Sequence, residues 1–360
     1  MTVNEILLIL LAVGAALGGI DLMLGNRFSL GEQFEKGFQM LGPVALSMAG
    51  ILCLAPVLTQ ILGPIVTPLC DLLRLDPGIF GSILAIDMGG YQLSVELAKD
   101  PQFGLFCGVI LSSIFGCTLV FTIPVGVGFL KAQDRPYFIR GILIGLITMP
   151  FSIVISGLML NLPLASLLWN CLPILLLSVL LGIGVLYRPA AMMVILEKFA
   201  AFIRIIAIFG LTVSAVSHLS GWEILPGILP LEESMQTISS ICIVMLGSMP
   251  LAQIIQRLLR TPLRIISEHT GLNSASTTAL LLGLVTATPA LAMLPQMNRR
   301  GMVVISAAFV SCICLIGAHF AFANALYPQM VPAQLAAKAL GGLLAAIIAM
   351  LATKDLRDDI

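Results

Sequence analysis

The sequence predicts an all-α, polytopic transmembrane protein, and composition and segment length are the two observations that predict it. Of the 360 residues, 59% are hydrophobic and 10% are charged, and the mean hydropathy is +1.09. A soluble globular chain carries about 25% charged residues. No soluble core could hide this much apolar surface, whereas helices of about 20 residues can place it in lipid. We therefore expect one transmembrane domain over 1–360.

Eleven apolar segments follow one another along the chain. They cover 6–25, 38–63, 78–98, 103–130, 141–160, 166–187, 199–219, 234–256, 274–294, 301–322 and 332–352. The first follows Glu5 rather than a basic residue, which argues against a cleaved signal peptide. We interpret it as the first spanning helix.

Two of these segments carry polar or helix-breaking residues at their centres, which suggests re-entrant or broken hairpins. The segment 78–98 contains Asp87, Gly89 and Gly90, and 274–294 contains Thr286, Thr288 and Pro289. If both re-enter, about nine spanning helices remain, with the N-terminus outside and the C-terminus inside. If both span instead, all eleven segments cross the membrane.

The distribution of basic residues favours the re-entrant alternative. In that topology only Arg74 and Lys99 lie on outer loops, and Lys338 lies within the last helix. The other fifteen lie inside, at positions 27, 36, 131, 135, 140, 188, 198, 204, 257, 260, 264, 299, 300, 354 and 357. If all eleven segments span, ten basic residues lie on inner loops and seven on outer loops, which fits the positive-inside rule less well.

An internal repeat accompanies the two hairpins, over about 37–130 and 234–323. Pro56 and Pro68 match Pro250 and Pro262 at one offset of 194 residues. The odd number of spans between the halves inverts the second relative to the first. Inverted repeats with broken helices are typical of secondary transporters, and the breaks mark the binding site.

Asp87 is the strongest candidate for contact with a substrate or ion, because a carboxylate at mid-membrane depth is rare and usually functional. It opens the stretch Asp87-Met88-Gly89-Gly90-Tyr91. The glycines allow close approach of the backbone, and the tyrosine ring can face an ammonium group. A small cation is the expected ligand. The structural alternative is a buried aspartate paired with a basic residue or a backbone amide.

Thr286, Thr288 and His319 complete the predicted substrate-binding set. Threonine hydroxyls could line a polar pocket, although they also join transmembrane helices to one another. His319 could contact substrate or carry a proton, and a hydrogen-bonded neutral histidine explains it equally well.

No cofactor, metal site or catalytic residue is predicted. The eight cysteines form no CxxC pair, and equal numbers of basic and acidic residues give no reason to expect nucleic acid. Membrane lipid is the expected surrounding partner. Gly341 and Gly342 offer a small-residue face for a homo-oligomer or for packing within one protomer.

Several ordered motifs resemble the ethanolamine-utilisation permease family, EutH. They are Leu84-Ala-Ile-Asp87-Met-Gly-Gly90, the run from Gly37 to Leu58, Phe121-Thr-Ile-Pro124-Val125, Gly221-Trp222-Glu223-Ile-Leu-Pro226-Gly227 and Gln296-Met297-Asn298-Arg299-Arg300-Gly301. The resemblance implies a bacterial inner-membrane protein that admits ethanolamine for catabolism. One departure is that Gly317-Ala318-His319 stands where the family pattern has Gly-Asp-His, which bears on coupling and on the exact amine.

Two other readings remain open at this stage. A membrane-embedded enzyme would need a nucleophile with a base, or a metal constellation, and Asp87 and His319 are isolated in sequence. A transporter or channel for another small amine or ion would share the same helices and the same acidic site.

Overall fold

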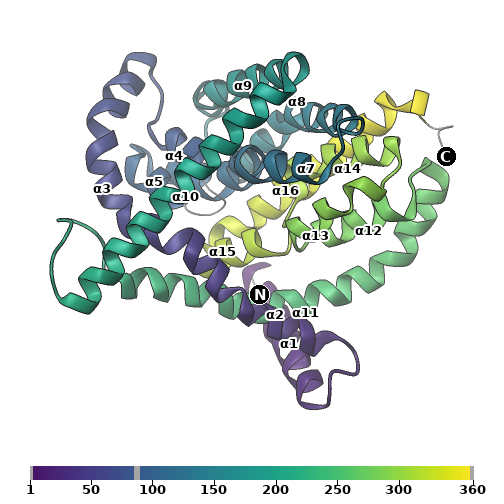
Figure 1. Ribbon diagram of the computed structural model, residues 1–360, viewed down its shortest axis with the longest axis horizontal. Coiled ribbons are helices and arrows are strands. Elements are labelled where there is room, and N and C mark those ends of the chain that lie inside the picture. The colour runs from purple at the N-terminus through teal and green to yellow at the C-terminus, as the bar shows by residue number, and fades with distance from the viewer. Residues whose placement is uncertain (1–2, 85–89, 357–360) are drawn as a thin grey trace.

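The structure is a computed structural model that describes residues 3–84 and 90–356 (Figure 1). Every regular element in these ranges is helical, which confirms the predicted all-α fold. The elements are α1 Val3–Met23, α2 Leu30–Gln39, α3 Leu41–Leu73, α4 Gly78–Leu84, α5 Gly90–Leu97, α6 Pro101–Leu105, η1 Phe106–Gly116, η2 Thr118–Thr122, α7 Ile123–Phe129, α8 Arg135–Met159, α9 Leu164–Tyr187, α10 Pro189–Ser220, α11 Leu231–Thr270, α12 Ser274–Gly283, α13 Ala287–Ala292, η3 Leu294–Gln296, α14 Arg299–Cys312, α15 Ala318–Leu326, η4 Pro328–Met330, α16 Val331–Ala352 and η5 Lys354–Leu356.

Eight helical stretches of the described chain are long and apolar enough to cross a membrane. They are Glu5–Met23, Leu30–Leu73, Pro101–Phe129, Arg135–Met159, Leu164–Gly184, Ala190–Ser220, Leu231–Pro262 and Pro328–Ala352. The eighth of the nine predicted spans, over 301–322, is not one helix, because α14 ends at Cys312 and α15 begins at Ala318. The reason for this break lies in its backbone partners, described below.

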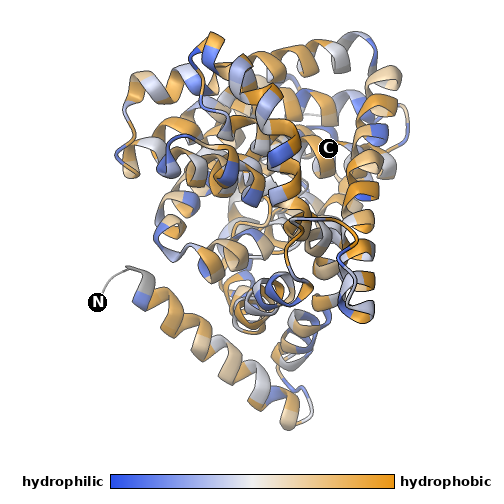
Figure 2. Ribbon diagram, turned by 90° about the vertical axis from the view of Figure 1, so that its left-hand side faces the viewer, coloured by the Kyte–Doolittle hydropathy of each residue, from blue (hydrophilic) through white to orange (hydrophobic). Residues whose placement is uncertain are grey.

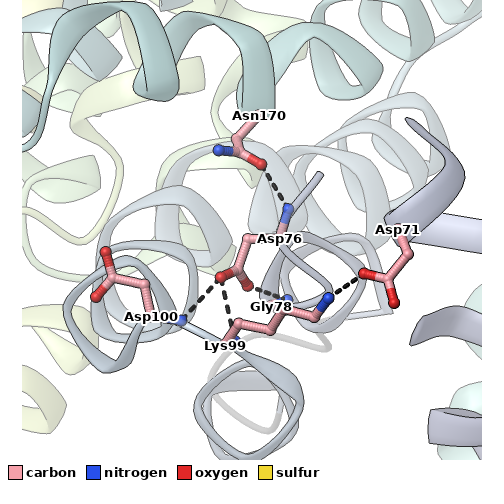
Figure 3. A network of polar contacts seen from close by, with 6 residues as sticks. All are labelled: Asp71, Asp76, Gly78, Lys99, Asp100 and Asn170. Atoms are coloured by element: carbon pink, nitrogen blue, oxygen red, sulfur yellow. Dashed lines mark hydrogen bonds and ion pairs between the residues drawn. The ribbon is translucent and has the colours of Figure 1, made fainter. Parts of the chain in front are cut away.

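Helices α4 and α5 form the arms of the first hairpin, and Asp76 holds its two ends together. The Asp76 carboxylate accepts hydrogen bonds from the backbone N–H of Gly78 at 2.8 Å, Lys99 at 3.1 Å and Asp100 at 2.9 Å (Figure 3). Asn170 on α9 accepts from the backbone N–H of Asp76 at 2.6 Å. The chain therefore enters and leaves this hairpin at one place.

Two asparagines close the second hairpin in a similar way. The Asn273 amide donates to the carbonyl oxygen of Gln296 at 2.8 Å, and the Asn298 amide donates to the carbonyl oxygen of Gly271 at 2.8 Å. Asn298 also caps α14 by accepting from the Gly301 N–H at 3.0 Å. The segment 274–296 thus begins and ends at the same point.

The bases of the two hairpins lie at opposite ends of α8. Gln102, just past the first hairpin, donates to the carbonyl oxygen of Leu160 at the C-terminal end of α8. Gly141, near its N-terminal end, packs against Val303 of α14, which follows the second hairpin. A helix of 25 residues is about 37 Å long. The two hairpins therefore extend into the molecule from opposite ends.

The same order of elements occurs twice along the chain. Long proline-containing α3 precedes the first hairpin, and long proline-containing α11 precedes the second. Pro56 and Pro68 lie in α3, and Pro250 and Pro262 lie in α11. This order and the opposed hairpins agree with the predicted inverted repeat, which stays a prediction.

The helix from Pro101 to Phe129 is the centre of the molecule. Its sequence is apolar on every side and nearly all of its residues are buried, as expected of a helix with no solvent or lipid face. Much of it is π-helical, over Phe106–Gly116 and Thr118–Thr122. In contrast, α1 projects from the body and packs on α2 and α11 (Figure 2).

Candidate functional site

Two unwound segments cross at the middle of the molecule and pair through their backbones. Between α14 and α15, the N–H of Cys314 donates to the carbonyl oxygen of Gly283 at 2.7 Å, and that of Ile316 donates to Leu284 at 2.8 Å. Gly317 permits this approach, because a Cβ there would collide with the carbonyl oxygen of Val285. The second hairpin thus supplies acceptors for amides that a continuous helix would have satisfied.

The ends of two helices converge on this crossing. Both α12 and α14 end there, at Gly283 and Cys312, and the C-terminal end of a helix carries partial negative charge. The hydroxyl oxygen of Ser311, the residue before Cys312, lies 3.3 Å from the hydroxyl oxygen of Ser152 in α8. The crossing is therefore well inside the molecule, where unwound backbone is tolerated if it is covered by protein or faces a cavity.

A cavity of about 510 Å³ opens against this crossing, within the usual range for small-molecule sites. Its wall includes Thr286, Thr288, Cys314 and Ala318, and most of the other lining residues come from the second hairpin, α11 and the α2–α3 region. Both predicted threonines therefore share one cavity. Ala318, the position that departs from the family pattern, faces the same space.

We call this 510 Å³ cavity the central cavity. A second cavity, of about 290 Å³, adjoins it. The two share Lys36, Met249, Val285, Thr286 and Pro289, and the second adds a polar wall of Gln33, Gln253 and Gln256. This polar wall lies toward the end of α11 that carries the basic residues Arg257 and Arg260. In the predicted topology, this end of α11 lies on the inner side of the membrane.

His319 follows Ala318 and points into a buried polar cluster. Its side chain is 1% exposed, and its Nδ1 lies 3.2 Å from Lys338 Nζ on α16. The ammonium group also donates to the carbonyl oxygen of Ser113 at 3.0 Å. A charged ammonium group has no lone pair and can only donate, so a charged Lys338 requires an unprotonated Nδ1 on His319.

Lys338 is the residue that sequence reasoning missed. It was placed within the last helix but given no role, although its side chain is fully buried. Long basic side chains near helix ends often reach the membrane surface, and the sequence does not show which way a lysine turns. The sequence did indicate that Lys338 lies inside the membrane, because it stands six positions after the start of the predicted segment 332–352, and a basic residue at such a position is rare.

Tyr91 links the first hairpin to the same helix, α15. Its ring, 1% exposed, has its centroid 5.0 Å from that of Phe322 and 5.0 Å from that of Tyr327. Gly90 begins α5 and is buried. Neither residue lines the central cavity. The candidates Asp87, Met88 and Gly89 lie outside the described residues.

Helix α15 therefore joins the predicted site residues of both halves. Ala318 faces the central cavity, His319 contacts Lys338, and Phe322 packs on Tyr91. The helix also carries Asn324, which is 4% exposed and whose amide has no hydrogen-bond partner in residues 3–84 and 90–356. A buried amide without a partner calls for an explanation such as a bound water or ligand. Among the described residues no cluster suited to a metal ion occurs.

Comparison with known proteins assigns the family. Residues 3–352 match the family described as ethanolamine utilisation protein, EutH. An uncharacterized protein YxeR of Bacillus subtilis (strain 168) is 39% identical over 350 residues, covering 97% of this chain and 95% of its own. A probable ethanolamine permease EutH of Listeria monocytogenes serotype 1/2a (strain 10403S) is 36% identical over 349 residues, covering 97% and 94%. One of Salmonella typhimurium (strain LT2) is 31% identical over 390 residues, covering 98% and 96%. No solved structure matches the chain.

Proposed function

This chain belongs to the ethanolamine utilisation protein EutH family, and we propose that it carries ethanolamine across the bacterial inner membrane. Its apolar helices make it a membrane protein. Relatives that match nearly the whole chain are named probable ethanolamine permeases, which supports a transport role. The substrate would travel as the protonated amino alcohol, because an aliphatic amine is charged near neutral pH.

The crossing of the two unwound segments beside the central cavity is the main structural support for a substrate site there. The C-terminal ends of α12 and α14 meet there and would favour a cation. Thr286 and Thr288 on the cavity wall offer hydroxyl groups to the hydroxyl of the substrate. Broken helices that meet at mid-membrane are also the usual binding site of secondary transporters.

Asp87 is proposed to hold the ammonium group together with Met88 and Gly89, whereas Gly90 and Tyr91 would support the site from behind, because the Tyr91 ring packs on Phe322 and does not line the central cavity. A carboxylate is the natural partner of a small ammonium ion in a water-poor environment. Its role rests on the sequence pattern alone. With Ala318 in place of the acidic residue of the family pattern, a loss of Asp87 should be poorly compensated.

Uptake of labelled ethanolamine into liposomes containing the purified protein tests the proposal. We expect saturable uptake with the compound recovered unchanged. Asp87→Asn should raise the apparent KM about ten- to a hundredfold, the equivalent of a charge-assisted hydrogen bond of about 1.5–3 kcal/mol. Asp134→Asn, a change on a loop next to Lys131, is the matched control.

Each other result would reject a defined part of the proposal. Chemical conversion of ethanolamine would indicate a membrane-embedded enzyme. Stronger uptake of a different amine in competition would replace the substrate. Normal KM in Asp87→Asn at equal protein density would leave transport intact and remove Asp87 from the site.

A further inference from the structure

The motif Gly221-Trp222-Glu223-Ile-Leu-Pro226-Gly227 takes no part in the central cavity, and its first three residues line a separate polar cavity instead. The cavity is about 300 Å³ and lies where α10 ends and α11 begins. Its polar wall is made of Ser214, Ser217, His218, Trp222, Glu223 and Glu232. We call it the outer cavity, because the predicted topology places the 221–230 loop outside the membrane.

The backbone of this loop is fixed, so the outer cavity is built into the fold. The N–H of Leu229 donates to the carbonyl oxygen of Cys53 on α3 at 2.9 Å. The Cys53 thiol lies 3.0 Å from the hydroxyl of Ser234 on α11. Gly221 and Gly227 adopt φ of 70° and 82°, which are left-handed values that glycine adopts without strain.

The outer cavity contains buried hydroxyl groups that no group of the described residues satisfies. Ser214 is 3% exposed, and its Oγ has no hydrogen-bond partner within the part of the chain that the structure describes. The Oγ of Ser217, one helical turn further along α10, is likewise buried without a partner. Buried polar atoms are rarely left in this state, so these two hydroxyls point to a polar ligand that occupies the cavity.

The charged groups of the outer cavity favour a cation. Glu232 accepts from His218 Nδ1 at 2.7 Å, and Glu223 makes no ion pair among the described residues. Trp222, which is 73% exposed, adds the aromatic face that binds ammonium groups best. Carboxylates, an indole and hydroxyls together match a small ammonium ion that also carries a hydroxyl group.

The position of the outer cavity relative to α11 connects it with the central cavity. Glu232 lines the outer cavity, Met245 and Met249 line the central one, and Gln253 and Gln256 line the 290 Å³ cavity that adjoins it. Thirteen residues separate Glu232 from Met245, which is roughly 20 Å of helix. The three cavities therefore follow one another along a single helix.

From this geometry we propose that the outer cavity is a capture site for small hydroxyl-bearing ammonium ions, distinct from the central cavity. Its position on the path to the central cavity rests on the proposed function, whereas the binding itself does not. The shared ligand chemistry, a primary ammonium beside an oxygen, also occurs in the headgroup of an aminophospholipid. The test must therefore separate the free ion from the lipid.

Trp222 is a built-in reporter, because the chain has only two tryptophans. Trp169→Phe leaves Trp222 as the sole indole. Purified protein in nanodiscs of phosphatidylcholine and phosphatidylglycerol would be titrated with ethanolamine hydrochloride at constant ionic strength, while Trp222 emission is recorded. We expect a saturable change with ethanolamine and none with ethylene glycol, which has two hydroxyl groups and no charge.

Two variants locate the binding groups. Glu223→Gln should weaken the apparent affinity at least tenfold, whereas Glu233→Gln, an exposed neighbour outside the lining, should leave it unchanged. Asp87→Asn should leave this signal intact, which separates the outer cavity from the proposed central site.

The remaining outcomes each overturn the proposal. An equal response to ethylene glycol would show that charge is not recognised, and a flat titration would show that no ion binds. If Trp222 responds only when phosphatidylethanolamine is added to the nanodiscs, the ligand is a lipid headgroup. Uptake that proceeds while Trp222 stays silent would retain the proposed transport and reject the capture site.

Discussion

Lys338 is the residue that most alters the predicted role of His319 in the site. A lysine buried in a transmembrane helix is costly and is functional by default, and this one contacts His319 and the backbone of the central helix. His319 was predicted as a substrate ligand. In the structure its Nδ1 instead lies beside the Lys338 amine, one residue away from the wall of the central cavity.

We predict that Lys338→Met impairs transport without impairing folding. Methionine fills a similar volume and removes the buried charge, so membrane insertion should become easier. Loss of a charge-assisted contact of about 1.5–3 kcal/mol should reduce ethanolamine uptake roughly tenfold or more. Uptake and the size-exclusion profile would be measured side by side, with Lys354→Met, an exposed change near the C-terminus, as the control. Full uptake by folded Lys338→Met would make the lysine a purely structural residue.

At the scale of the elements, the two hairpins could be foreseen and the third break could not. Glycine at 89 and 90 and proline at 289 are local signals of a broken helix. The break at 313–317 lacks such a signal apart from Gly317, because the segment is apolar and its amides find acceptors at Gly283 and Leu284. Those partners are distant in sequence. The asparagine pair at 273 and 298 was missed for the same reason.

We predict that the first hairpin depends on the Asp76 carboxylate more than on the nearby surface ion pair. Asp76→Ala removes three hydrogen bonds to backbone N–H groups and should destabilise the hairpin by about 1.5–3 kcal/mol. Hydrogen exchange of the amides of α4 and α5 should accelerate accordingly. Asp71 pairs with Lys99 in the same network (Figure 3), and both side chains are half exposed.

The matched control for that experiment is therefore Asp71→Ala. An exposed ion pair contributes about 0–1 kcal/mol, so exchange in α4 and α5 should hardly change. Equal acceleration in the two variants would show that general loss of negative charge, rather than the backbone clamp, controls the hairpin.

At the scale of the whole molecule, several basic residues gather at one end of α8, whereas the orientation of the chain in a membrane stays a prediction. Arg140 lies 3.7 Å from Asp355, and Arg300 donates to the carbonyl oxygen of Met350 at 3.2 Å, which gathers basic residues at the N-terminal end of α8. The other end of α8 carries the acidic network of the first hairpin (Figure 3). Sequence alone could give this polarity, since it depends only on loop composition. It could not give the path of cavities along α11, which depends on tertiary packing.

The last prediction fixes the orientation of the molecule in the membrane. All eight native cysteines are buried, so replacing them with alanine or serine leaves a background suited to single reporters. Leu164→Cys and Glu233→Cys lie at exposed positions of the predicted outer side, and Lys131→Cys and Lys354→Cys at exposed positions of the predicted inner side. A charged maleimide added to intact spheroplasts should label the first pair and reach the second pair only after lysis. The positive-inside rule supplies the physical reason, because loops rich in lysine and arginine are retained on the cytoplasmic side. Labelling of Lys131→Cys in intact spheroplasts, with Glu233→Cys protected, would invert the protein, place the outer cavity in the cytoplasm and make it an exit site.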